Sequence, residues 1–275
     1  MRLLRRLVAG ALAATALFVL WLSAVWPPPV WYRSHFPAET AFMRMRDSVA
    51  AYRPVPLDSI SPHFARAVLT GEDHRFWAHG GLDYTELRRA LGYRRPAFSW
   101  LSARDWAELV RASSHLWERR NAIRGASTIT QQLAKNLYLS PSRNPLRKVK
   151  EAVTAYRLEV VLGKRRILEL YANLVELGPG IWGAEAASRH YYGRSASRLS
   201  RAQAAALAAT LPFPLLSNPA SRPARMRWRQ NLILRRMRGE PVEVPRVEEP
   251  EAAPLPPAPV VDSLPRLELD SGLVD

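Results

Sequence analysis

Cysteine is absent from this chain of 275 residues. Without thiols the protein cannot be a disulfide-stapled scaffold, use a thiol nucleophile or hold a metal through sulfur. Acidic residues are also few, 24 against 40 Lys and Arg, so the net charge is +16. Such a charge indicates an anionic partner, which means nucleic acid, anionic lipid or a phosphorylated substrate. Hydrophobic residues make up 48% of the chain, which is enough for a core and excludes wholesale disorder.

Charge is missing altogether from residues 7–26, LVAGALAATALFVLWLSAVW. A helix of this length, at ~1.5 Å per residue, spans a hydrocarbon core about 30 Å thick. Arginines precede it in residues 1–6 and tryptophans lie near its far end, which predicts a cytoplasmic N-terminus and one transmembrane helix. A cleaved secretory signal is the alternative, although its apolar region is usually only ~7–15 residues long. In either case most of the chain lies outside the cytoplasm, so nucleic acid is not the expected partner.

The rest of the chain divides by composition. Residues 239–275 contain eight prolines, nine acidic residues and only two arginines, and this composition predicts a disordered acidic tail. An electrostatic contact between this tail and the basic remainder of the chain stays open. Residues 27–62 form a membrane-proximal segment, and residues 63–238 are the expected folded domain.

Within 63–238 the apolar pattern is helical. Apolar residues recur at intervals of three and four over residues 129–137, 149–162, 167–174 and 204–211. Ser127 stands where a helix cap is expected, and Gly163 is expected to end a helix. No convincing alternation of strand type is found, so the fold class is predicted to be mainly α.

The first chemistry-bearing segment is GEDHRFWAHGGLD, residues 71–83. An apolar helical stretch ends directly in this charged cluster. A carboxylate beside the aromatic walls of Phe76 and Trp77 can have a raised pKa, as a general acid or base requires. The alternative is a solvated helix terminus with charge pairs. A metal site is a weaker alternative, because the two histidines stand five residues apart, a poor spacing for one helix face.

Two further segments carry polar groups. In GASTITQQLAKNLYL, residues 125–139, hydroxyls and amides crowd the start of a helix, where backbone N–H groups attract anions. Its ammonium and amides suit a sugar and its phosphate, although an ordinary capped amphipathic helix is the alternative. In RKVKE, residues 147–151, Arg147 and Glu151 share a helix face. The alternative for this pair is a surface salt bridge worth ~0–1 kcal/mol.

Taken in order, these segments and KRRILELYANLVELGPGIWGAEAASRHYYG resemble the peptidoglycan glycosyltransferases of family 51, which also form a domain of bifunctional penicillin-binding proteins. The resemblance covers roughly residues 55–238. It implies a mainly α, lysozyme-like glycosyltransferase domain with a membrane-associated jaw, preceded by the transmembrane helix. Because the chain leaves no room for a transpeptidase domain, we expect the monofunctional kind. Residues 93–124 make the jaw longer than usual, and we expect this insertion to lie on the membrane surface.

The resemblance implies a reaction. Lipid II is polymerised into β-1,4-linked glycan strands with release of undecaprenyl pyrophosphate. Glu72 matches the essential base, which deprotonates the acceptor sugar, and Glu151 matches the second acid in the donor half of the cleft. The remaining matches are substrate-binding positions, with Lys135 and Arg147 on the donor pyrophosphate: Arg75, Ser127, Thr128, Gln132, Lys135, Arg147 and Arg229.

The resemblance also implies cofactors, partners and location. No cofactor is required and no resident metal site is expected, while Mg²⁺ or Mn²⁺ at the pyrophosphate stays open. The partners are lipid II, the growing glycan strand and the bilayer, with other cell-wall synthesis proteins left open. The location is the bacterial inner membrane, with the catalytic domain on the periplasmic side. A lysozyme-like lytic enzyme and a non-catalytic membrane-anchored scaffold are the rival functions, and the Lys135, Arg147 and Glu151 set argues against the first.

Overall fold

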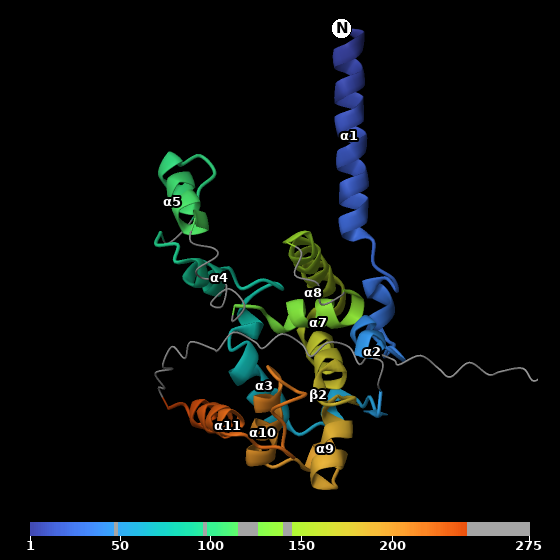
Figure 1. Cartoon of the computed structure of the whole chain (residues 1–275), viewed down its shortest axis with the longest axis vertical. Helices are drawn as coiled ribbons and strands as arrows, with labels where there is room; N and C mark the ends of the chain where they lie inside the picture. The colour runs from blue at the N-terminus through green and yellow to red at the C-terminus, as the bar shows by residue number, and fades with distance from the viewer. Residues whose placement is uncertain (47–48, 96–97, 115–125, 140–144, 241–275) are drawn as a thin grey trace, which may run out of the picture. The chain divides into compact units, whose positions relative to one another are not determined.

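The computed structural model describes residues 1–46, 49–95, 98–114, 126–139 and 145–240. Within them the chain is mainly helical, which confirms the predicted fold class, and the few strands are two or three residues long (Figure 1). Residues 1–241 form one unit by their contacts. Most of the expected acidic tail, and residues 96–97 and 115–124 of the expected insertion, lie outside the described residues.

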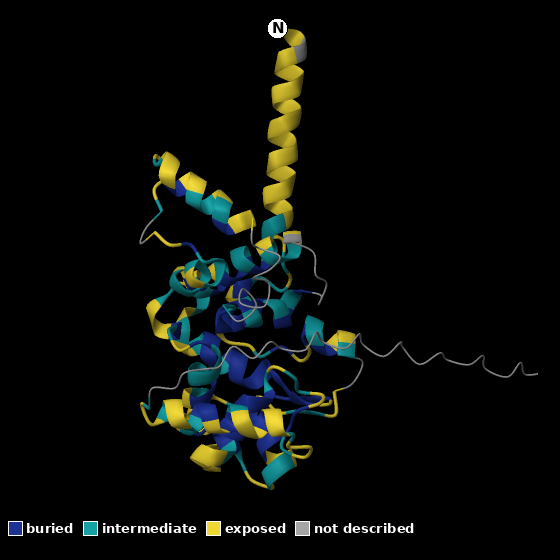
Figure 2. Cartoon of the chain, turned by 60° about the vertical axis from the view of Figure 1, so that its left-hand side comes forward, coloured by how far each residue is buried: buried dark blue, intermediate teal, exposed yellow. Residues whose placement is uncertain are grey.

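The N-terminal apolar run forms α1 (Arg2–Ser23), and residues 4–23 are long and apolar enough to cross a membrane. Figure 2 shows this helix exposed over almost its whole length, as expected of a helix whose partner is lipid. It ends at Ser23, three residues before the predicted end. A helix continuing to Pro27 would bring the proline ring against the carbonyl of Ser23, four residues earlier, so the helix stops there.

Short elements follow the anchor: the 3-10 helix η1 (Pro29–Arg33), α2 (Ala41–Arg46), β1 (Ala51–Tyr52) and the 3-10 helix η2 (Leu57–Ser59). β1 pairs in parallel with β3 (Ile181–Trp182), and β3 pairs antiparallel with β2 (Glu176–Gly178). The sheet order is therefore β1-β3-β2. Strands of two or three residues are too short to show alternation, which is why the sequence did not predict them.

The first motif lies at the end of α3 (Pro62–Glu72), which begins at Ser61 with a hydroxyl cap on its first turn. After α3 come the 3-10 helix η3 (Phe76–Ala78), α4 (Tyr84–Leu91) and α5 (Ala103–Ser114). Asp83 caps α4 by accepting the N–H groups of Thr85 and Glu86. The first candidate carboxylate, Glu72, therefore stands on the last residue of a partly buried helix.

The centre of the domain is α7 (Ile129–Tyr138) packed against the long α8 (Pro145–Leu174). The 3-10 helix η4 (Ala196–Arg198) and three helices complete the domain: α9 (Ala184–Tyr192), α10 (Arg201–Thr210) and α11 (Ala224–Met237). α10 packs against both α3 and α11, and its residues 204–209, AAALAA, are all buried. Small side chains let these helices approach closely, which brings α11 near the end of α3 (Figure 1).

α8 is broken at Gly163, where φ is 72° and ψ is 161°. Only glycine adopts this conformation readily. The predicted helix end at Gly163 is therefore an interruption, after which the chain resumes as a second helical half. The first half carries Arg147 and Glu151, and the second half carries Tyr171, so one glycine separates the two groups of side chains.

Candidate active site

Glu72 lies between two donors from distant helices. Gln132 of α7 donates from Nε2 to Glu72 Oε2 at 3.0 Å, and Arg229 of α11 donates to Glu72 Oε1 at 2.6 Å. The Glu72 side chain is 13% exposed. These two contacts of Glu72 are polar. The aromatic side chains expected beside it differ in exposure: Phe76 is buried and Trp77 is 61% exposed. The Glu72 carboxylate therefore lies close to the surface, with its position fixed from both sides.

A third residue extends this chain of hydrogen bonds. The hydroxyl of Tyr171 in α8 donates to Gln132 Oε1 at 2.8 Å. Burial raises the pKa of Tyr171 well above its ordinary value, and the negative charges of Glu72 and Asp73 add to the effect while Arg229 opposes it. Sequence reasoning treated Tyr171 only as a member of the apolar face, because a buried tyrosine at helical spacing carries no sign of what its hydroxyl meets.

Asp73 connects the first motif to the start of α7. Its Oδ2 accepts the Ile129 N–H at 2.9 Å, and its Oδ1 lies 2.9 Å from His79 Nε2. Asp73 is 7% exposed. The alternative of a solvated helix terminus is therefore wrong for this residue, which was not among the predicted site residues. Its contacts set Glu72 at a defined distance from the helix that carries Gln132.

The cap of α7 is Thr128 rather than the expected Ser127. The Thr128 hydroxyl accepts the Gln131 N–H at 3.2 Å and donates to the Gly81 carbonyl at 2.6 Å. The Gln131 Oε1 accepts the Thr128 N–H at 3.1 Å, which completes a capping box. Thr128 is 2% exposed, so its hydroxyl is committed to the helix start.

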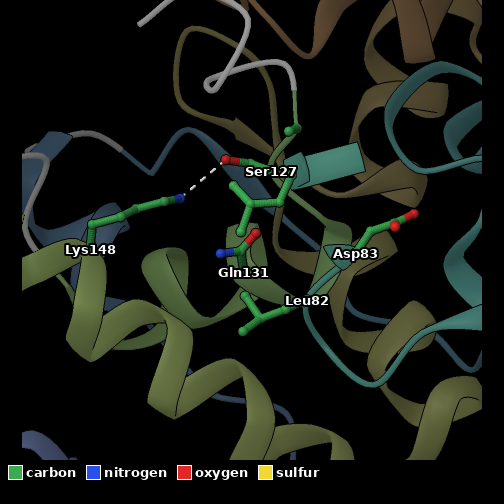
Figure 3. A pocket seen from close by; sticks show the side chains of 7 residues that line it. Leu82, Asp83, Ser127, Gln131 and Lys148 are labelled. Atoms are coloured by element: carbon green, nitrogen blue, oxygen red, sulfur yellow. Dashed lines mark hydrogen bonds between the residues drawn. The ribbon is translucent and has the colours of Figure 1, made fainter. Parts of the chain in front are cut away.

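A second cluster surrounds Glu151. Arg147 donates to its Oε2 at 2.7 Å, and Lys148 contacts its Oε1. The side chains of Glu151 and Arg147 are 3% and 19% exposed, so the alternative of a surface salt bridge does not describe this pair. Lys148 Nζ also donates to the Ser127 hydroxyl at 3.1 Å, which ties α8 to the segment ahead of α7 (Figure 3).

A small cavity of about 40 Å³ lies beside this contact (Figure 3). Its walls come from the start of α4, the start of α7 and α8: Leu82, Asp83, Leu87, Ala126, Ser127, Gln131 and Lys148. A volume of this size admits water rather than a sugar. Arg75, a predicted substrate residue, lies at the same helix start, with its Nε 2.9 Å from Asp83 Oδ2.

Lys135 of α7 interacts electrostatically with both carboxylates, Glu72 and Glu151. Burial lowers its pKa, and the positive charges of Lys148 and Arg147 act in the same direction. Glu151 and Glu72 both act to raise it, Glu151 more strongly. The structure therefore places Gln132 and Arg229 at Glu72, and Arg147 at Glu151. Arg75 and Thr128 instead contact Asp83 and Gly81. Lys135 interacts electrostatically with both carboxylates.

An ion pair between Lys164 and Glu159 helps to hold together the elements that carry the site residues. Lys164, directly after the break in α8, lies 2.7 Å from Glu159 Oε1, and the same oxygen accepts the Thr130 hydroxyl at 2.6 Å. Lys164 Nζ also lies 4.2 Å from the centre of the Phe76 ring. These contacts join the first motif, α7 and both halves of α8, and sequence reasoning assigned none of them.

Metal ligation is not evident in the part of the chain that the structure describes. Among residues 1–46, 49–95, 98–114, 126–139 and 145–240, no three His, Asp or Glu side chains are grouped as a metal ion would require. The cationic side chains near Glu151 are instead suited to an anion, because Arg147 and Lys148 contact this one carboxylate and Lys135 interacts with it electrostatically, which leaves an excess of positive charge.

Known proteins are similar to this chain over the residues that form the site. The family described as Transglycosylase matches residues 39–95 and 96–238, a range that contains every site residue above. A biosynthetic peptidoglycan transglycosylase of Azoarcus sp. (strain BH72) is 42% identical over 219 residues, which cover 76% of this chain and 85% of the relative. Proteins of the same name from Bordetella avium and Bordetella pertussis are 39% and 40% identical, covering 86% and 89% of this chain and 94% and 95% of theirs.

Proposed function

The chain belongs to the transglycosylase family, and we infer that it is a peptidoglycan glycosyltransferase, which polymerises glycan strands in cell-wall synthesis. The observation that carries this proposal is that one stretch of chain, residues 127–132 at the start of α7, meets both carboxylates. Gln132 donates to Glu72, and Ser127 accepts from Lys148, which contacts Glu151. Glu72 is held as an acceptor by an amide and a guanidinium, whereas Glu151 is buried among cations. A base and an anion site close together are what the transfer of a sugar from a pyrophosphate requires.

We propose that Glu72 takes the proton from the 4-hydroxyl of the acceptor lipid II. The hydroxyl oxygen forms a bond to the anomeric carbon of the donor strand. At the same time the bond from that carbon to the pyrophosphate oxygen breaks, and its electron pair leaves with the pyrophosphate. The configuration at the carbon inverts, so an α-linked donor gives a β-1,4 product, with the base on the face opposite the leaving group.

The chemistry of the leaving group indicates what the cluster around Glu151 does. Pyrophosphate is a good leaving group that needs its developing charge neutralised more than it needs a proton. We propose that Lys135, Arg147 and Lys148 supply that positive charge. Both oxygens of Glu151 are already in contact with cations, so its proposed role is to orient Arg147 and Lys148 toward the donor. No resident cofactor is proposed, and a divalent ion would arrive with the pyrophosphate.

The other predicted substrate residues receive different proposals. Arg229 holds Glu72 in position through their ion pair, and it reaches substrate only when that contact opens. Ser127 and Arg75 stay proposed substrate residues at the donor edge. Thr128 is buried in a helix cap, which favours a positioning role.

Membrane association follows from the apolar helix α1 and from the nature of the substrate. We propose that the helix anchors the chain in the inner membrane with the enzyme domain on the periplasmic side, because arginines precede it and the catalytic unit follows. Exposed apolar side chains support further lipid contact, on one face of α8 and at the start of α5: Leu146, Val149, Tyr156, Val160, Trp100 and Leu101. Protein partners in cell-wall synthesis stay a prediction.

The test is polymerisation by the purified full chain. Incubation with lipid II in detergent, followed by gel separation, should give a ladder of glycan strands. Glu72→Gln keeps the volume and removes the base, so the rate should fall by about 10²–10⁴-fold. Glu39→Gln is the matched control, because Glu39 is an exposed glutamate away from the site. Shortening of added strands would indicate the lytic rival, and no product at all would indicate the scaffold.

A further inference from the structure

Tyr171 reaches the candidate base through a single side chain. Its hydroxyl lies 2.8 Å from Gln132 Oε1, and Gln132 Nε2 lies 3.0 Å from Glu72 Oε2. The three residues are far apart in the chain, on α8, α7 and α3. Tyr171 is fully buried, so only Gln132 and Glu72 of this series reach the surface of the site.

The chemistry of the amide makes this arrangement directional. A glutamine side chain presents a donor at one end and an acceptor at the other, and an ionised carboxylate only accepts. The amide must therefore turn its nitrogen toward Glu72 and its oxygen toward a donor. The phenol of Tyr171 is that donor, and it holds the amide in the one orientation that serves Glu72.

The phenol keeps its proton throughout the working range. Burial raises the pKa of Tyr171 well above its ordinary value, with Glu72 and Asp73 adding to the effect. The hydroxyl can therefore donate at every pH at which a carboxylate base is ionised. A hydroxyl that titrated near neutrality would lose this role as the pH rose.

We propose that Tyr171 is a positioning residue for the transfer reaction, which acts by fixing the Gln132 amide so that it donates to Glu72. The proposal rests on the proposed function, in which Glu72 is the base. The hydrogen bond holds one oxygen of the Glu72 carboxylate and leaves the carboxylate aimed at the acceptor hydroxyl. A tyrosine that only filled the core would make no use of its hydroxyl.

Tyr171→Phe removes the hydroxyl and keeps the ring. The amide then loses its fixed orientation, and kcat should fall by about 2- to 10-fold, the factor that corresponds to one hydrogen bond. The ionised carboxylate of Glu72 then loses part of its hydrogen bonding. The acid limb of the pH profile should therefore move to higher pH, while the KM for lipid II changes little.

The other charged groups around Glu72 are the same in the wild type and in Tyr171→Phe. They are Arg229 from α11, Lys135 from α7 and the neighbouring Asp73. Tyr52→Phe is the matched control, because the Tyr52 hydroxyl donates to the Pro37 carbonyl at 2.9 Å, away from these groups. Tyr52→Phe should lower the melting temperature by about as much as Tyr171→Phe does, because each loses one hydroxyl hydrogen bond. It should leave kcat and the pH profile unchanged.

A double-mutant cycle separates the relay from a general effect on the fold. Gln132→Met removes the amide, so adding Tyr171→Phe to that variant should change kcat by less than about 2-fold. If Tyr171→Phe lowers kcat by the same factor in both backgrounds, Tyr171 does not act through Gln132 and the inference fails. A wild-type rate and pH profile in Tyr171→Phe would also overturn it.

Wild-type protein and Glu72→Gln are measured beside these variants. If the wild type forms glycan strands and Glu72→Gln does not, the proposed function stands, and the Tyr171 variants alone decide the inference. If Glu72→Gln polymerises at the wild-type rate, Glu72 is not the base, and the proposed mechanism fails together with the inference.

Discussion

Replacing Glu151 by glutamine should reveal whether its charge organises the cations of the donor site. The substitution keeps the volume and removes the negative charge that faces Arg147, Lys148 and Lys135. The Glu151 side chain is 3% exposed and that of Arg147 is 19% exposed, so solvent neutralises little of the remaining charge near these two residues. The folded state should therefore be destabilised by repulsion among the cations.

The magnitude follows from burial. Breaking a fully buried ion pair by removing one partner costs about 3–5 kcal/mol. The Lys148 side chain is 42% exposed and regains water, so we discount the loss to about 2 kcal/mol. In a domain of this size each kcal/mol lowers the melting temperature by about 2–4 °C, which gives an expected decrease of about 4–8 °C. Lys135 should also become more acidic, since Glu151 is the stronger of the two charges that raise its pKa.

Inorganic pyrophosphate provides the decisive measurement. If the cluster is an anion site, pyrophosphate replaces the missing charge and should bind Glu151→Gln more tightly than the wild type. At 100 times the Kd of the variant it should stabilise the variant by about 2.7 kcal/mol and the wild type by less. Thermal unfolding of the full chain in detergent, with and without pyrophosphate, measures this difference. Glu39→Gln is again the control and should behave as the wild type. An unchanged melting temperature, or equal stabilisation of both proteins by pyrophosphate, would refute the reasoning.

Three further predictions concern other parts of the chain. Burial lowers the pKa of Lys135, so polymerisation should decline as the pH rises through that lowered value, and Lys135→Arg should move the decline to higher pH. Gly163→Ala forces a side chain into a backbone conformation of φ 72° and should cost about 1–3 kcal/mol, seen as a lower melting temperature, and an unchanged value would contradict this account. Deletion of residues 241–275 should leave the rate of polymerisation unchanged, whereas a faster rate would identify the tail as an electrostatic inhibitor.

Much of the architecture could be predicted because it is decided locally. The apolar run at the N-terminus, the helical spacing of residues 129–137 and 204–211, and the break at Gly163 depend on neighbours within about one helical turn. The prediction of a helix cap was wrong by one residue where two neighbouring hydroxyl residues could both cap the helix. Thr128 rather than Ser127 caps α7, because Thr128 also has Gln131 three residues later to complete the capping box.

The sequence by itself determined the helical fold class, the membrane anchor and the segments that contain Glu72 and Glu151. Only the tertiary structure decided which side chains meet. Arg229 reaches Glu72 from 157 residues away, and Tyr171 reaches Gln132 from 39 residues away. Neither pairing has a local signature, since a buried tyrosine and a partly buried arginine fit any amphipathic helix. These contacts exist because α10 packs α11 against α3, and because α7 packs against α8, which is a property of the assembled core.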